Sequence, residues 1–210
     1  LGIGKTTFLK HLAIQCNQGK FAAHQVPIFI CLREFVEDSR QRDKLSLGHY
    51  LGLKLHRAGI ENSSIVKKLL QEGRVLLLLD GLDEVLKDDI MEVLKELRKF
   101  CDQYYKNSFV VSCRIALPKL QLQGFTDVEI APFTQSQITT FAKKWFSTLV
   151  ENNPSLANNQ SSQFIEKLDL PENWQFRQLV VTPLFLHLAC CFFQSQGKLS
   201  LMQTEFYKQG

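Results

Sequence analysis

Several features that would narrow the function of this 210-residue chain are missing from its sequence. The six cysteines include no C-x-x-C pair and the five histidines also lack metal-ligand spacing, so we predict neither a disulfide framework nor a zinc site. We interpret the cysteines in apolar runs as buried thiols of a reducing cytoplasm, where we expect the protein to reside. The net charge of +4 is evenly spread and gives no reason to expect nucleic acid or a membrane surface as a partner.

Long hydrophobic runs are also missing. The longest apolar stretch, 179–193, is shorter than the ~20 residues that a helix needs to cross a bilayer. It also contains Thr182, Pro183 and His187. We therefore predict no membrane span and interpret the stretch as a buried helix.

What remains is an ordinary globular composition, 45% hydrophobic and 22% charged. Continuous apolar runs rich in β-forming residues alternate with segments of helical periodicity. The alternation predicts an α/β fold with a doubly wound parallel sheet, in which ligands bind at the carboxyl ends of the strands. The expected strands are 26–32, 75–80, 109–113 and a short fourth at 128–130, with helices at 7–14, 47–55, 64–71 and 88–101 and a polar loop at 37–44.

The pattern changes after Pro132, because no further strand is evident. We expect helices at 134–150, 162–168, 174–180 and 183–194, with an Asn/Ser-rich linker at 152–162. The sequence therefore predicts two parts: a core over 1–131 and a small all-helical domain over 132–210.

The opening stretch, LGIGKTTFLK, matches the end of a phosphate-binding loop. Gly4, Lys5 and Thr6 fill the last three positions of G-x-x-x-x-G-K-[ST]. We expect the first glycine of the motif to lie just before Leu1, together with the strand that precedes it. The alternative is a glycine-rich start to an ordinary helix.

Each residue of this loop has an expected task. Gly2, Ile3 and Gly4 would bring main-chain N–H groups close to phosphates. Lys5 would reach the β- and γ-phosphates, and the Thr6 hydroxyl would ligate Mg²⁺. Thr7 either contacts the α-phosphate or only begins the helix.

A second motif, RVLLLLDGLDEV, is the strongest signal in the chain. Five aliphatic residues bury a strand that delivers Asp80 at its carboxyl end, where a buried carboxylate needs a cation such as Mg²⁺. Many phosphate-loop ATPases place a catalytic carboxylate directly after this Asp, but here that position is Gly81. The general base would therefore be Asp83 or Glu84, either of which could orient a water for attack on the γ-phosphate. The alternative is an acidic turn that caps the next helix.

These motifs resemble the NACHT domain of the signal-transducing ATPases with numerous domains, a family of phosphate-loop NTPases. Its second motif is an Asp, a small residue, a hydrophobic residue and two acids, which the residues from Asp80 to Glu84 match. The likeness extends to the segments 26–35, 110–114, 128–146, 181–193 and 197–210. It implies that Arg114 faces the γ-phosphate and distinguishes ATP from ADP, and that Pro183 packs on the adenine. By local rules, Arg114 is otherwise a surface cation and Pro183 an ordinary first-turn proline.

The resemblance also implies a function. Such a module binds ATP or ADP with Mg²⁺, is closed with ADP, and opens and self-associates with ATP, while slow hydrolysis resets it. It implies signalling or defence, with effector and sensor domains in the flanking sequence, and it alone favours ATP over GTP. Two alternatives stay open: a turnover ATPase that remodels nucleic acid or protein, and a non-hydrolysing scaffold that uses bound nucleotide for folding.

Overall fold

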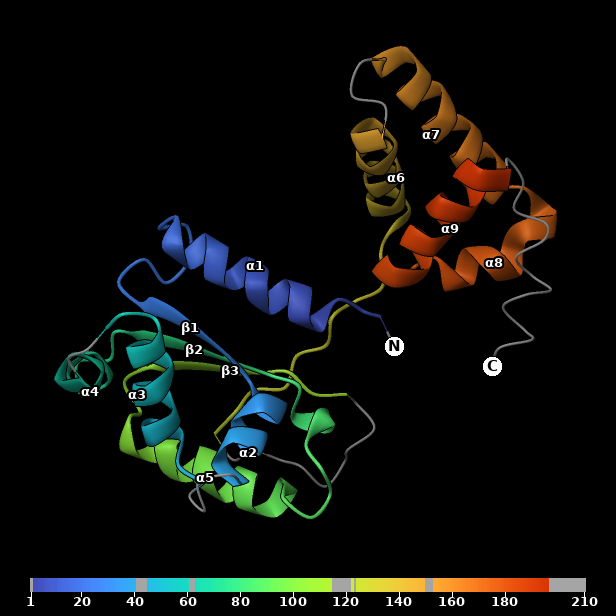
Figure 1. Ribbon diagram of the computed structural model, residues 1–210. Helices are drawn as coiled ribbons and strands as arrows, with labels where there is room; N and C mark the ends of the chain where they lie inside the picture. Colours follow the sequence, from blue (N-terminus) through green and yellow to red (C-terminus); the bar gives the residue numbers. More distant parts are fainter. Residues whose placement is uncertain are drawn as a thin grey trace. The chain divides into compact units, whose positions relative to one another are not determined.

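The computed structural model describes residues 2–40, 45–60, 63–114, 122, 124–149 and 153–196 (Figure 1). These residues form two compact units, Lys5–Val128 and a second unit drawn from 1–4 and 129–210. The segment 197–210, which contributes to the family resemblance, lies outside the described residues, as do 41–44 of the predicted loop.

The first unit is built on a parallel sheet of three strands in the order β1 (Val26–Cys31), β2 (Val75–Asp80) and β3 (Ser108–Val111). Val26 lies opposite Val75, and Leu79 lies opposite Val111. The predicted parallel α/β architecture is thus confirmed for these three strands. Their carboxyl ends, which carry Asp80, meet at one edge of the sheet.

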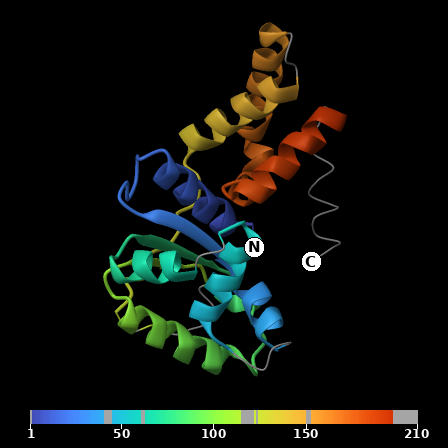
Figure 2. The same ribbon diagram turned by 60° about the vertical axis from the view of Figure 1, so that its left-hand side comes forward.

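The central strand β2 is buried along its whole length, as its run of aliphatic residues requires. Leu77 and Leu79 point to one side of the sheet, and Leu76 and Leu78 to the other. The first side packs on α2 (Leu32–Arg40), α3 (Leu47–Arg57), α4 (Ser63–Gln71) and α5 (Ile90–Gln103), and the second on α1 (Lys5–Asn17). Helices therefore cover both faces of the sheet (Figures 1 and 2).

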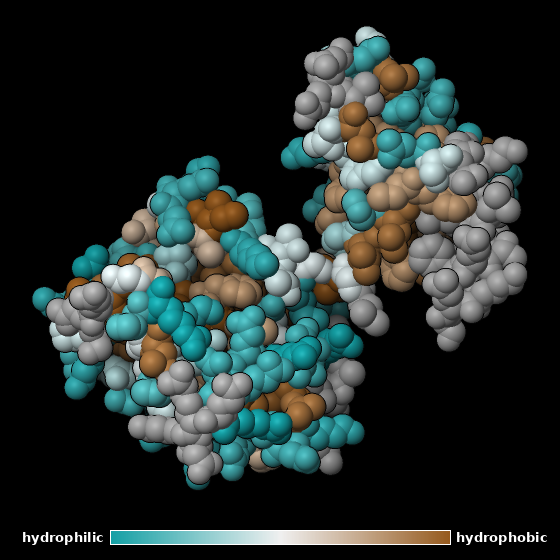
Figure 3. Space-filling model, in the orientation of Figure 1, coloured by the Kyte–Doolittle hydropathy of each residue, from teal (hydrophilic) through white to brown (hydrophobic). Residues whose placement is uncertain are grey.

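The face of the first unit seen in Figure 3 is mostly hydrophilic, as expected where the apolar residues are buried in a core. Hydrophobic side chains on this face lie in small separate groups (Figure 3). A single apolar interior on each side of the sheet accounts for most of the aliphatic residues.

Two predictions for this unit are wrong. The segment 128–130 forms no strand, and Val128 is 86% exposed. A three-residue segment makes a strand only where a neighbour completes its hydrogen bonds, and none of the described strands pairs with it. The predicted loop at 37–44 is helical as far as Arg40. Its charges lie on the outer face of α2, where Arg33 and Glu37 pair one turn apart, while Phe35 is fully buried.

The second unit contains α6 (Gln135–Leu149), α7 (Pro154–Leu168), the short 3₁₀ turn η2 (Pro171–Asn173), α8 (Trp174–Leu179) and α9 (Pro183–Gln196). They share one aromatic core, in which the ring of Phe146 packs against Phe164 and Phe193. The described residues of this unit include no strand.

The predicted linker at 152–162 is wrong, because α7 begins at Pro154. The Asn153 side chain caps the helix by accepting a hydrogen bond from the Leu156 N–H at 3.1 Å, and Pro154 occupies the first turn. Small buried residues, Ala157 and Ser161, form the inner face of this polar stretch.

None of the helices in the described part of the chain has both the length and the apolar character needed to cross a membrane.

Candidate functional site

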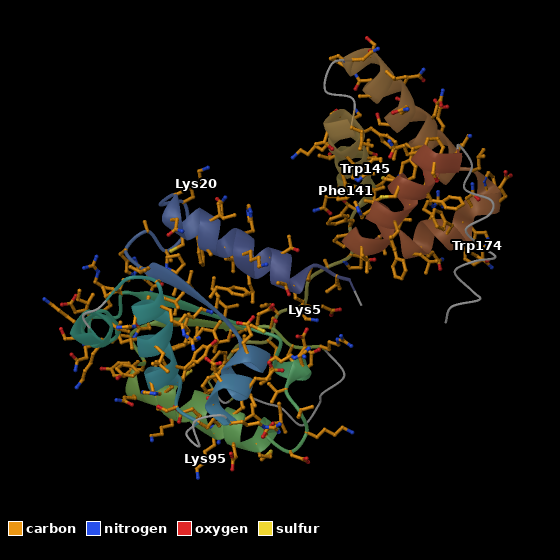
Figure 4. All side chains as sticks on the ribbon, in the orientation of Figure 1. Lys5, Lys20, Lys95, Phe141, Trp145 and Trp174 are labelled. Carbon is orange, nitrogen blue, oxygen red and sulfur yellow. The ribbon has the colours of Figure 1, made fainter. Side chains whose placement is uncertain are left out.

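Two residues far apart in sequence meet at the carboxyl end of β2. The Thr6 hydroxyl donates a hydrogen bond to Asp80 Oδ2 at 2.6 Å, across 74 residues. Helix α1 packs on the sheet through Leu9 and Cys16, which brings its first turn to this edge. Asp80 is only 9% exposed, so its carboxylate depends on such partners. Figure 4 shows Lys5 in the same first turn of α1.

The other oxygen of Asp80 is held by a residue that sequence reasoning missed. Ser112 follows β3 and donates its hydroxyl to Asp80 Oδ1 at 2.6 Å. The same hydroxyl oxygen accepts from the Gly81 main-chain N–H at 2.9 Å. Two main-chain hydrogen bonds lie on either side of this contact. The Ser112 N–H donates to the Leu79 carbonyl, and the Leu82 N–H donates to the Ser112 carbonyl. The hydroxyl therefore ties the end of β2 to the end of β3.

The turn after Asp80 depends on a glycine. Gly81 has φ 80° and ψ 47°, the left-handed region that favours glycine, and leads into the 3₁₀ turn η1 (Leu82–Glu84). A side chain at Gly81 would meet the carboxyl group of Glu84, whose Cδ would be 3.1 Å from the added Cβ. Glu84 is exposed, and its carboxylate thus lies beside the main chain directly after Asp80.

Asp83 and Arg114 form an ion pair at the same edge. The Arg114 Nε–H donates to Asp83 Oδ2 at 2.8 Å, and the Arg114 main-chain N–H donates to Oδ1 at 3.0 Å. The Asp83 side chain is 8% exposed, whereas that of Arg114 is 53% exposed. Burial raises the pKa of the Cys113 thiol, Asp83 raises it further, and Lys5 lowers it. The Asp83 carboxylate and the Lys5 ammonium are therefore both close enough to change the pKa of Cys113, in the loop that follows β3.

The donor set at Asp80 fits Mg²⁺. A buried carboxylate and a hydroxyl are hard oxygen ligands, and Mg²⁺ in proteins takes one or two such groups together with phosphate oxygens and waters. Over the described residues, no group of three or more His, Cys, Asp or Glu side chains is placed to hold a metal. The Thr6 hydroxyl and the Asp80 carboxylate are the two protein groups whose chemistry fits such an ion at this place.

The glycines before Lys5 are described with the second unit. The Leu184 N–H donates to the Gly2 carbonyl at 3.3 Å, and a Cβ on Gly2 would lie 2.7 Å from Leu184 Cδ2. Gly4 faces Pro183, the first residue of α9, with 3.6 Å between an added Cβ and Pro183 Cγ. Both glycines have positive φ, 73° and 90°, so their conformations favour glycine. The Thr7 hydroxyl makes no hydrogen bond within the described residues, and the side chain of Ile3 is purely aliphatic.

Comparison with known proteins gives one match. The family model for the NACHT domain matches residues 1–148, which is more than half of the chain. No curated protein and no solved structure matches it.

Proposed function

Because the chain belongs to the NACHT domain family, we propose that it binds ATP and ADP with Mg²⁺ at the carboxyl end of β2 and hydrolyses ATP slowly. Membership makes it a nucleotide-binding module with a phosphate-loop NTPase fold. The observation that carries the proposal is the hydrogen bond between Thr6 and Asp80. It joins the G-K-T of the opening stretch to the D-G-L-D-E of the second motif, as a shared Mg²⁺ and phosphate site requires.

Each residue of the site has a proposed role. Main-chain N–H groups of 2–7 bind phosphates, Lys5 contacts the β- and γ-phosphates, and Thr6 and Asp80 hold Mg²⁺. When bound, Mg²⁺ neutralises charge that develops on the phosphates during hydrolysis. Arg114 faces the terminal phosphate, and Asp83 or Glu84 orients the attacking water. The adenine contact of Pro183 remains a prediction.

The module is proposed to act as a switch. ADP holds the protein closed, and exchange for ATP permits opening and self-association in a signalling or defence protein. In this proposal the sheet is doubly wound, and a helical domain follows near Pro132. Effector and sensor domains lie in the flanking sequence, and the protein is located in the cytoplasm. Support comes from the family and from the joint presence of Lys5, Asp80 and Arg114. The two acids Asp83 and Glu84 argue against a scaffold that binds nucleotide without hydrolysing it, because such a scaffold would not need them.

Nucleotide retained by the purified full-length protein tests the proposal. The protein is denatured and the released nucleotide is identified by chromatography, for wild type, Lys5→Ala and Lys20→Ala. Lys20 is an exposed cation just beyond the other end of α1 and serves as the matched control (Figure 4). We expect about one ADP per chain in wild type and in Lys20→Ala, and loss of ADP in Lys5→Ala, because the ammonium contacts phosphates.

Three results would contradict the proposal. A wild type that retains no adenine nucleotide and binds none when it is added would exclude the nucleotide site. A wild type that turns ATP over continuously, with stimulation by nucleic acid or a protein substrate, would replace the switch by a remodelling ATPase. If replacing Asp83 and Glu84 together left function intact, the module would be a non-hydrolysing scaffold.

A further inference from the structure

The two acids of η1 have different surroundings. Both oxygens of Asp83 accept hydrogen bonds from Arg114, one from the main-chain N–H at 3.0 Å and one from Nε–H at 2.8 Å. No ion pair engages Glu84 within the described residues, and its side chain is exposed. A base needs a carboxylate oxygen that can accept a proton from water. Each oxygen of Asp83 already accepts one hydrogen bond from Arg114, whereas the Glu84 carboxylate accepts none within the described residues.

The position of the Glu84 carboxylate adds a second difference. Gly81 has no side chain, and the space beside it is taken by the Glu84 carboxyl group, 3.1–3.2 Å from where a Cβ would lie. The carboxylate of Glu84 therefore lies directly after Asp80 along the turn, next to the residue that would hold Mg²⁺. A carboxylate at this point lies beside the residue that follows the proposed Mg²⁺ ligand and is not part of the Asp83–Arg114 ion pair.

Asp83 fixes Arg114 and leaves it able to bind a second anion. A guanidinium carries five N–H donors in a rigid fork, and Asp83 uses only the one on Nε. The Arg114 side chain is 53% exposed, and within the described residues no ion pair engages its two terminal nitrogens. Because the main-chain bond also anchors Asp83, the carboxylate sets the direction in which the fork points.

We propose a division of labour between the two acids: Asp83 is a positioning residue that aims Arg114 at the terminal phosphate, and Glu84 is the general base. The inference rests on the proposed function, because it assigns roles at the same nucleotide site. The oxygen of the attacking water forms a bond to the γ-phosphorus and its proton passes to Glu84, while the bond from the γ-phosphorus to the oxygen that bridges it to the β-phosphate breaks. The products are ADP, which keeps the bridging oxygen, and inorganic phosphate. Asp83 takes no proton in this step.

The test separates affinity from hydrolysis in the full-length protein. Dissociation constants are measured for ADP and for a non-hydrolysable ATP analogue, and hydrolysis is measured in single turnovers. The variants are Glu84→Gln, Asp83→Asn, Arg114→Met and the double variant Asp83→Asn/Arg114→Met. Asp89→Asn is the matched control, since Asp89, the residue before α5, pairs at 2.6 Å with a similarly exposed arginine, Arg40 at the end of α2.

We expect Glu84→Gln to lower hydrolysis at least about 100-fold without changing the ratio of the two affinities. Asp83→Asn should lower the preference for the triphosphate about three- to tenfold, because an amide N–H₂ opposite Arg114 Nε–H releases the fork. In the Arg114→Met background, Asp83→Asn should cause no further loss of triphosphate preference. Asp83→Asn should also lower hydrolysis no further than Arg114→Met does. Asp89→Asn should change neither quantity.

Several results would overturn the inference. If Asp83→Asn lowered hydrolysis to the level of Glu84→Gln in both backgrounds, Asp83 would be the base. If Asp83→Asn left the preference for the triphosphate unchanged or increased it, Asp83 would not be the residue that positions Arg114. If Asp83→Asn did not fold, full hydrolysis by Glu84→Gln would still refute the assignment. A wild type that binds neither nucleotide would remove the proposed function and this inference together, whereas the other results leave the proposed function standing.

Discussion

Replacing Ser112 by Ala should destabilise the first unit more than any other deletion of one hydroxyl on β3 or the loop after it. Ser112 is 7% exposed and its hydroxyl makes two bonds, one to a carboxylate at 2.6 Å and one from a main-chain N–H at 2.9 Å. A hydrogen bond to a charged group contributes about 1.5–3 kcal/mol, and a buried N–H left without a partner costs about 1–3 kcal/mol. Because the two losses share one atom and the site relaxes, we expect a total of about 2–4 kcal/mol.

The assay is urea unfolding of the purified protein, with free energies compared at constant m-value. Ser108→Ala is the matched control, because Ser108 lies at the exposed start of the same strand, and we expect a change within about 0.5 kcal/mol. Ser112→Thr keeps a hydroxyl and should recover much of the loss. If Ser112→Ala and Ser108→Ala unfolded at the same urea concentration, the bridge between the ends of β2 and β3 would contribute nothing, and our account of Asp80 would be refuted.

Two further predictions concern the same fold. Gly81→Ala should destabilise the protein by about 1–2 kcal/mol, because φ at this position is 80°. Gly52→Ala inside α3, where an added Cβ meets nothing within 4 Å, should instead stabilise it by about 0.5–1 kcal/mol. Thermal unfolding of both variants checks these opposite signs. Burial raises the pKa of the Cys190 thiol from 9.0 to about 12, with a further contribution from Cys191. The stability that the neutral thiol provides is therefore complete below pH 9 and is lost as the pH rises toward 12, so the free energy of unfolding should fall more steeply over that range in wild type than in Cys190→Ala, and parallel curves would contradict this.

The strands of the sheet were predictable because each contains a short apolar run, although β1 and β3 end one and two residues before the predicted ends at 32 and 113. For β2 the predicted and observed bounds are the same, 75–80. Helix α7 was harder, because its inner face at Ala157 and Ser161 is small and not aliphatic, so its first turns give no hydrophobic period. The signal that was present is Asn153 followed by Pro154, a helix cap with a proline in the first turn.

The predicted strand at 128–130 fails for a different reason. Its residues have β propensity, but propensity describes how a residue fits a sheet that already exists. With 86% of Val128 exposed, the segment has neither a neighbouring strand among those described nor a covered face. Local sequence therefore predicts a strand best where burial on both faces can be read from the run itself, as in β2.

The contact between Ser112 and Asp80 follows from the register of the strands and not from a sequence motif. Leu79 lies opposite Val111, so the next residues along the two parallel strands, Asp80 and Ser112, are neighbours at the sheet edge. From sequence, Ser112 was one small polar residue before a cysteine and an arginine, and nothing in its local pattern distinguished it. Once strands 75–80 and 108–111 are known to pair, the hydroxyl next to the carboxylate follows from the pairing.

The choice between Asp83 and Glu84 depends on one backbone conformation. Spacing alone leaves both acids equivalent, since each lies within four residues of Asp80. With Gly81 in the left-handed region, the chain reverses into η1 and Asp83 is directed toward the loop after β3, where it is buried against Arg114. The same reversal returns Glu84 to the space that the missing side chain of Gly81 leaves open. The glycine that takes the place of a catalytic carboxylate in other phosphate-loop ATPases is thus the residue that permits Glu84 to supply one.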